Sequence, residues 1–185
     1  MGFVRVLALL TILLPDAVHA QEHQHGIASP YGGEQTREIK SLSNEEMADL
    51  RKGAGSGFAK AAELNGVPGP SHLLELKDEI RLDPQQTAAI QAIFDRMRAD
   101  AISAGTGLIS HEKALDIEFK NGSITDGTLA EMIAKIEESR GKLRYIHLSA
   151  HLKTRVILNA DQIDKYNSLR GYADPKHSSR KVTSQ

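Results

Sequence analysis

Two long segments with helical periodicity, separated by one tight turn, constrain the fold of this 185-residue chain more than any other feature. From Pro84 to about Phe119, apolar residues recur at spacings of four and three, and a second such segment runs from about Asp126 to Ile157. Asn121-Gly122 between them is a turn signal. Two helices joined by so short a turn must lie antiparallel. The sequence therefore predicts an all-α fold built on a long antiparallel helical hairpin with short flanking helices.

The flanking helices are predicted from capping signals and chain breaks. Leu42-Ser43-Asn44-Glu45-Glu46 has the pattern of a capping box and predicts a short helix, which the glycine-rich run 53–57 interrupts before a possible second helical stretch over 58–64. Ser71 is expected to cap a helix that continues to about Ile80. Neither long helix can bury its apolar stripe against the other alone. We therefore expect the short helices, a second subunit or both to cover the remainder.

The pattern Leu-x-x-x-Gln occurs twice, once at each end of the predicted hairpin. In each copy the second residue is placed to accept a hydrogen bond from the third helical N–H, and the glutamine reaches back to the cap residue's own N–H. The leucine precedes the cap, where it helps to orient the entering chain. We interpret both copies as helix starts with a structural role. Their residues are Leu82, Asp83 and Gln86 in the first copy and Leu158, Asn159 and Gln162 in the second.

The N-terminus has the composition of a secretory signal peptide. Arg5 supplies a basic region, Val6–Leu14 an apolar run, and Val18-His19-Ala20 a small-residue cleavage site before Gln21. The apolar run is shorter than the ~20 residues that span a bilayer, so a retained membrane anchor is the weaker alternative. The chain has no cysteine, which excludes disulfides, thiolate metal sites and a lipid-modified cysteine. The predicted product is an exported protein.

The sequence predicts four parts: a signal peptide at 1–20, a flexible arm at 21–41, a helical domain at 42–172 and a disordered tail at 173–185. The formal net charge is −1 and the aromatic content is 4%, which argues against nucleic-acid binding. No nucleophile elbow, phosphate loop or metalloprotease motif is present. We therefore expect neither an enzyme nor a cofactor, with a divalent transition metal as the single alternative considered below.

The chain resembles the Spy/CpxP-type family, the LTxxQ proteins of the Gram-negative envelope. The resemblance covers about residues 66–172 and is carried by the Pro68-Gly69-Pro70 break, the following Leu73-Leu74-Glu75-Leu76, and the two Leu-x-x-x-Gln boxes around a hairpin. Both boxes have Asp or Asn where the family usually has Thr, which preserves the cap. The family includes ATP-independent refolding chaperones, stress-response modulators and heavy-metal-resistance proteins.

This resemblance implies a periplasmic protein, commonly a cradle-like homodimer whose concave face holds unfolded or misfolded envelope proteins. A regulatory role through an inner-membrane sensor kinase is a further implication. The strongest chaperones of this type have a basic cradle, whereas the charge of this chain is balanced. Candidate client-binding residues are Arg96, Met97, Arg140 and Arg144. The alternative is that these side chains form an ordinary solvated helix face.

His147 and His151 lie four residues apart on the second long segment, so they share a helix face and can ligate one metal ion. Pairing the hairpin about its turn brings Asp95 to the same height, which predicts a candidate site for Zn, Cu, Ni or Co. The spacing is similar to the His-x-x-x-His arrangement of the family's nickel- and cobalt-sensing members. The alternative is that His147 is a hydrogen-bonded core histidine. Loose metal capture is also considered for the terminal histidines His23, His25 and His177.

Overall fold

The computed structural model describes residues 29–172. By its internal contacts the chain divides into two compact units, residues 1–33 and 34–185. Only residues 29–33 of the first unit are described, and they form a turn in which the Gly32 N–H donates to the Ser29 carbonyl. All that follows concerns the second unit.

Several predictions fall outside the described residues. They are the signal peptide at 1–20, the first part of the arm at 21–28 and the tail at 173–185. The terminal histidines His23 and His177 belong to these segments, as does His25.

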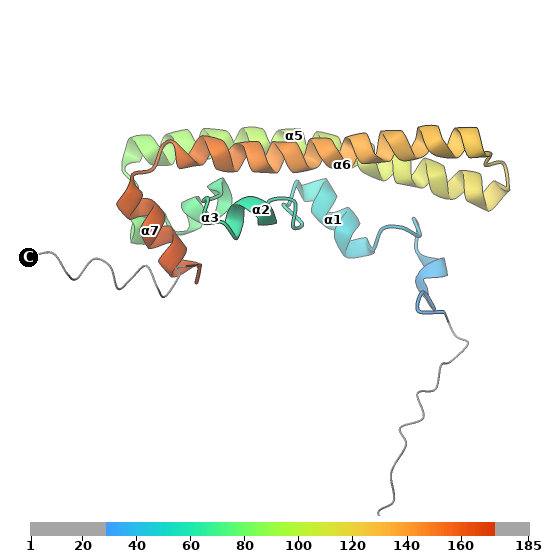
Figure 1. The fold of residues 1–185 in the computed structure, drawn as a ribbon, viewed down its shortest axis with the longest axis horizontal. Helices are drawn as coiled ribbons and strands as arrows, with labels where there is room; N and C mark the ends of the chain where they lie inside the picture. Colours follow the sequence, from blue (N-terminus) through green and yellow to red (C-terminus); the bar gives the residue numbers. More distant parts are fainter. Residues whose placement is uncertain (1–28, 173–185) are drawn as a thin grey trace, which may run out of the picture. The chain divides into compact units, whose positions relative to one another are not determined.

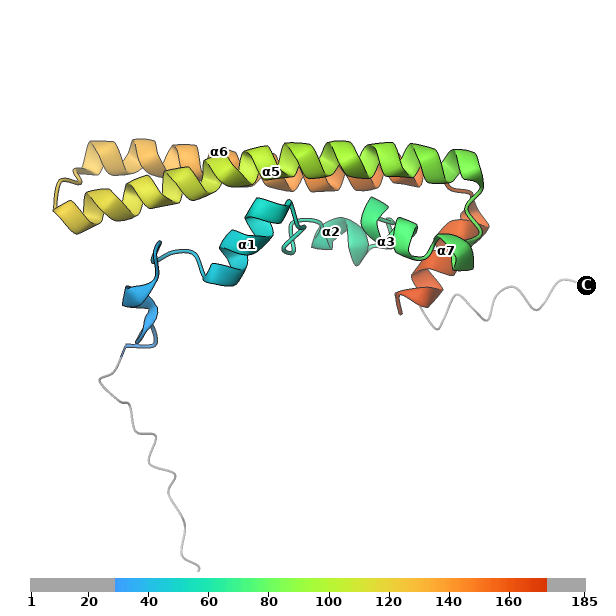
Figure 2. The same ribbon diagram turned by 180° about the vertical axis from the view of Figure 1, so that it is seen from behind.

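The predicted hairpin is confirmed. Helix α5 (Pro84–Asn121) and helix α6 (Asp126–Arg155) lie side by side along their length (Figures 1 and 2). Gly122 ends α5 in the left-handed conformation, with φ of 67°. A non-glycine residue adopts this conformation at a cost, which explains the Asn-Gly turn. Thr125 then caps α6 through its hydroxyl, which accepts from the Thr128 N–H.

The all-α prediction is also confirmed, because residues 29–172 contain no strand beyond an isolated bridge between Ile39 and Leu42. Ser43 caps the first α-helix with the expected box, in which its hydroxyl accepts from the Glu46 N–H. The flanking elements are a 3-10 turn (Glu34–Thr36), α1 (Asn44–Lys52), α2 (Lys60–Glu63), α3 (Pro70–Glu75), α4 (Lys77–Ile80) and α7 (Ala160–Leu169).

The expected cap at Ser71 is wrong. Helix α3 begins at Pro70 with Gly69 as its N-cap residue, and the helix stops at Leu76 instead of continuing to Ile80. Proline is well placed at a first helical position because its φ is already helical and its missing N–H has no intrahelical partner there. The Pro-Gly-Pro segment therefore starts the helix, and Ser71 lies within it.

The N-terminal segment covers one face of the hairpin and fills the main core. Gly105 permits a close approach of α1 to α5, since a Cβ there would lie 2.6 Å from the Leu50 carbonyl oxygen. Ile39 is fully buried, so the packed chain begins before residue 42, the predicted start of the helical domain. The apolar stripe of the hairpin is thus covered largely by the chain itself. The buried cluster comprises Ile39, Leu42, Met47, Leu50, Ala101, Ala104, Leu108, Ile136 and Leu143.

The two Leu-x-x-x-Gln boxes form as predicted, and they also bond to each other. The Asp83 carboxylate accepts from the Gln86 N–H at 2.7 Å, and the Asn159 side chain accepts from the Gln162 N–H at 2.9 Å. The side-chain amides of the two glutamines then exchange hydrogen bonds of 2.9 and 2.8 Å. Each amide donates a second hydrogen bond to a backbone carbonyl, Gln86 to Ile157 and Gln162 to Arg81. The boxes therefore join the start of α5 to the α6–α7 connection.

A second apolar cluster surrounds this pair of glutamines. Leu158, which precedes the second cap, is buried, and Leu82, which precedes the first, packs against the same cluster. Its other buried members come from α3, α4, α5 and α7, namely Leu73, Ile80, Ile90 and Tyr166. Both leucines of the repeated pattern therefore pack in one core at the base of the hairpin.

Replacing either glutamine should destabilise the fold, because its partner amide would be left without hydrogen bonds in a largely buried setting. We expect Gln86→Ala and Gln162→Ala each to lower the free energy of unfolding by about 1–3 kcal/mol. The double variant should lose less than the sum, since the two side chains act as one unit. Urea denaturation of the four proteins in this double-mutant cycle measures the coupling.

The neighbouring exposed Gln85 supplies the matched control, and Gln85→Ala should leave the free energy of unfolding nearly unchanged. Strict additivity of the two buried substitutions would contradict the paired arrangement.

Candidate functional site

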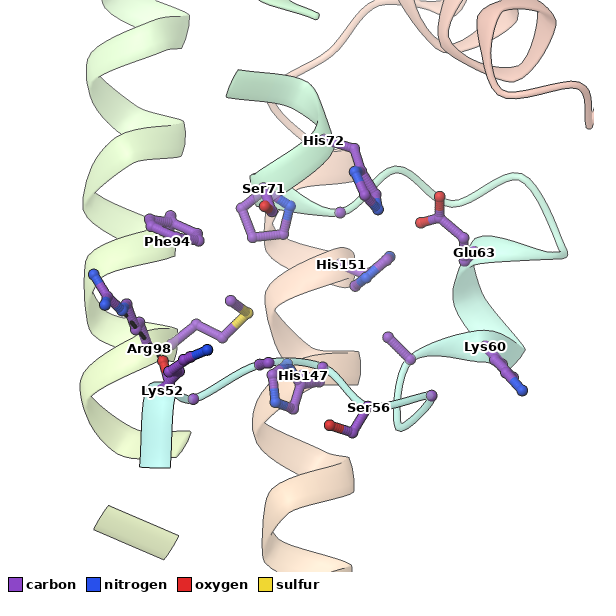
Figure 3. A pocket seen from close by; sticks show the side chains of 18 residues that line it. Lys52, Ser56, Lys60, Glu63, Ser71, His72, Phe94, Arg98, His147 and His151 are labelled. Atoms are coloured by element: carbon purple, nitrogen blue, oxygen red, sulfur yellow. Dashed lines mark hydrogen bonds between the residues drawn. The ribbon is translucent and has the colours of Figure 1, made fainter. Parts of the chain in front are cut away.

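A pocket of about 510 Å³ lies between the N-terminal segment and the hairpin (Figure 3). The loop 53–57 and the starts of α2 and α3 form one side, and α5 and α6 form the other. From α6 come His147 and His151, which confirms that the two histidines share a face. From α5 come Phe94, Met97 and Arg98.

His147 is a buried imidazole that lacks a partner for one nitrogen. Its side chain is only 3% exposed, and its ring stacks on Phe58 with 6.1 Å between ring centroids. Its Nε2 is buried and neither donates nor accepts a hydrogen bond. Burial lowers the pKa of His147 below the ordinary value of 6.5, and the neighbouring His151 adds to this effect. The ring is therefore neutral at neutral pH.

His151 is buried too, but one of its nitrogens is engaged. Its Nδ1–H donates to the Val67 carbonyl over 2.7 Å, so Nδ1 is not available to a metal ion. A Cβ on Gly69 would lie 2.5 Å from the Nε2 of His151, so only glycine allows the backbone to approach the imidazole so closely. The hydroxyl of Thr154 donates to the Pro68 carbonyl at 2.6 Å and fixes the same segment against α6.

Glu63 is a pocket residue that the sequence pattern did not single out. One carboxylate oxygen accepts from the Tyr166 hydroxyl at 2.7 Å and from the Arg170 guanidinium at 3.2 Å. The other, Oε2, is buried and has no hydrogen-bond partner. Burial raises the pKa of Tyr166, and the hydrogen bond to Glu63 raises it further, so the phenol stays protonated. The partners of Glu63 lie on α7 and at its C-cap, far along the chain, which is why no local motif marks this residue.

The predicted metal site of His147, His151 and Asp95 is not formed. Asp95 is exposed on α5, where it accepts from the Gln91 side chain at 2.9 Å. Consecutive helix residues are rotated by about 100°, so the face that presents Phe94 to the pocket turns Asp95 away from it. In the described part of the chain, no three His, Asp or Glu side chains are grouped to hold one metal ion.

Two of the predicted client-binding residues lie together at a second groove, and one of them, Met97, also lines the histidine pocket. Arg96 and Met97 line a second groove of about 300 Å³ between α5 and α6, together with Ile93 and Tyr145. The Arg96 guanidinium pairs with Asp100 at 2.9 Å but stays largely exposed. The groove is formed by the two hairpin helices alone.

The other two predicted residues differ from each other. Arg140 is half-buried and pairs with the buried carboxylate of Glu112, which also accepts from the Ser41 hydroxyl. Its guanidinium therefore ties α6 to α5 and to the N-terminal segment, and it is not free for a client. Arg144 is exposed, and within residues 29–172 it forms no ion pair.

The fold and this site define an all-α helical-hairpin protein with a buried histidine pair beside a pocket. Comparison of the chain with protein-family models, curated proteins and solved structures finds no match. The resemblance to the Spy/CpxP-type family therefore rests on the residues quoted above and stays a prediction. Across the described residues, no helix is both long enough and apolar enough to cross a membrane.

Acid should destabilise the fold through His147. The unfolded chain takes up a proton on this residue near pH 6.5, whereas the folded chain does so only at lower pH, because burial lowers the pKa. The contribution of His147 to the free energy of unfolding is therefore present above about pH 6.5 and is lost as the pH falls through the lowered pKa. Urea denaturation between about pH 7.5 and pH 5 measures this loss.

His147→Leu removes the titrating group, so its stability should depend less on pH across this window. An equally steep decline in the His147→Leu variant would show that other groups cause the acid sensitivity.

Proposed function

We propose that the protein binds non-native polypeptides of the bacterial envelope without ATP and so limits their aggregation. The observation that carries this proposal is the groove between α5 and α6, which includes Ile93, Met97 and Tyr145 beside the Arg96 guanidinium. Solvent-accessible apolar side chains next to exposed charge provide weak, reversible contacts for apolar segments of unfolded chains.

The position of this groove changes the expected binding mode. The resemblance implied a concave, open cradle, but the apolar face of this hairpin is packed against Ile39, Leu42, Met47 and Leu50 of the same chain. Clients would therefore contact the groove that the two long helices form by themselves. Because the inner faces of α5 and α6 are already packed, a client can bind in the groove without disrupting the core.

Other exposed apolar side chains extend the surface available to clients. Near the turn of the hairpin these are Ile117, Phe119 and Ile133, with exposed fractions of 43%, 56% and 43%. These exposed apolar side chains are further contact points for apolar client segments. Export to the periplasm, a homodimer and a sensor-kinase partner remain predictions of the sequence resemblance.

The protein should suppress the aggregation of chemically denatured clients when it is mixed with them at equimolar amounts. Light scattering after dilution from denaturant measures this, without nucleotide in the buffer. Ile93→Ser/Met97→Ser should weaken suppression severalfold, because the substitutions remove the apolar wall of the groove while sparing the buried clusters.

Leu64→Ser is the matched control, since Leu64 is 65% exposed but is the C-cap residue of the short helix α2, outside the groove. It should leave suppression unchanged. No suppression by the unaltered protein, for several unrelated clients, would exclude the chaperone proposal.

A second candidate function is metal binding in envelope metal resistance. It is favoured by the unpartnered Nε2 of His147 and by His151 in the same pocket, whose Nδ1–H bond to a carbonyl is the usual orientation of a metal-ligating imidazole. Imidazole nitrogens are suitable ligands for Zn, Cu, Ni or Co, but two of them do not complete a coordination shell. No third His, Asp or Glu of the described residues is grouped with these two histidines, and Asp95 points away from the pocket.

Calorimetric titration with Zn, Cu, Ni and Co tests this second candidate. His147→Ala and His151→Ala should each weaken binding at least tenfold, whereas Asp95→Asn should have no effect. The absence of binding at micromolar metal, or binding that survives both histidine substitutions, would remove the metal proposal.

A further inference from the structure

The second half of α6 and the residues that follow it carry basic residues and no acidic ones. Between Ser139 and Leu158 there is no Asp or Glu, whereas the first half of α6 contains several acidic residues. The charge of the chain is balanced overall, so this local excess is invisible in the composition. The basic residues of the stretch are Arg140, Lys142, Arg144, Lys153 and Arg155.

An exposed apolar stripe runs along the same part of α6. Tyr145, Leu152 and Val156 are 73%, 62% and 84% exposed. Their spacings of seven and four place them on one side of a helix, and the C-cap residue Val156 keeps helical backbone angles. This stripe lies on the side of α6 opposite the buried positions Leu143 and Ala150. Helix α6 is therefore apolar on its outer face as well as on its inner face.

The basic side chains flank this stripe on both sides. Lys142 and Lys153 are eleven residues apart, which is three helical turns, and therefore lie in one row. Arg144 and Arg155 have the same spacing and form a second row on the other side of the stripe. Around the helix axis, each row is rotated by roughly 60–100° from the stripe. All four are exposed, and none of them forms an ion pair within the described range.

We infer that this outer face of α6 binds the surface of a membrane rich in anionic phospholipid. Helices that lie flat on a membrane surface have this arrangement of an apolar stripe between two rows of Lys and Arg. The apolar side chains enter the boundary between headgroups and acyl chains, and the cations contact lipid phosphates. A planar anionic surface contacts both rows at once. An extended acidic peptide would lie along a single row, so the observations favour the membrane.

The inference is independent of the chaperone proposal. Leu152, Val156 and Arg155 do not line the groove between α5 and α6, although Tyr145 and Lys153 do. Because a single helix face makes the contact, the binding should be reversible.

Vesicle flotation tests the inference, using the purified protein without its predicted signal peptide. Vesicles of phosphatidylcholine with phosphatidylglycerol should bind the protein, and vesicles of phosphatidylcholine alone should bind it weakly. Arg144→Gln/Arg155→Gln should lower the partition coefficient by about twenty-five-fold, since each of the two cations near an anionic surface contributes about fivefold. Leu152→Ser/Val156→Ser should also reduce binding, and high salt should weaken binding of the unaltered protein.

Matched variants separate this face from net charge and from the client groove. Lys77→Gln/Lys165→Gln removes the same charge from exposed positions on α4 and α7, and it should bind vesicles like the unaltered protein. Ile93→Ser/Met97→Ser should likewise retain vesicle binding. Equal binding to both vesicle types, or no effect of the α6 variants, would overturn the inference. Binding of polyglutamate that depends on these residues, without vesicle binding, would overturn it in favour of an acidic polypeptide partner.

Discussion

The reciprocal hydrogen bonds between Gln86 and Gln162 are the interaction on which the arrangement of this domain depends. Each side-chain oxygen accepts from its own cap residue's N–H and from the other glutamine, and each side-chain nitrogen donates to the other glutamine and to a backbone carbonyl. Both amides therefore use their full donor capacity. Because each glutamine also completes a helix cap, the pair fixes where α5 and α7 begin and holds both starts together. The second apolar cluster forms around this junction.

A second constraint, the close approach of the Pro68-Gly69-Pro70 segment to α6, determines which surfaces stay open. Gly69 lies against the His151 imidazole, and the Thr154 hydroxyl bonds to the Pro68 carbonyl. This contact places the N-terminal segment across the inner face of the hairpin, where it encloses the histidine pocket. The groove and the outer face of α6 are left to solvent, and these surfaces carry the proposed interactions.

The local structure of the hairpin could be predicted from the sequence because its signals are local. The observed starts at Pro84 and Asp126 match the predicted ones, since caps and turns depend on a few neighbouring residues. The shared face of His147 and His151 also followed from their spacing. Asp95 was misplaced because equal height on two helices does not determine which way each helix is rotated. Arg140 was misinterpreted because its partner, Glu112, is buried through contacts distant in sequence.

The sequence by itself determined the helices, their order and the two capped starts at the ends of the hairpin. The mutual bonding of the two glutamines was decided only by the tertiary structure, as were the burial of His147 without a partner for Nε2 and the filling of the inner face by Ile39 and its neighbours. Helix formation follows from hydrogen bonds and caps within a few residues. The packing of one helix face against another depends on side chains separated by most of the chain, and no local pattern encodes which of them meet.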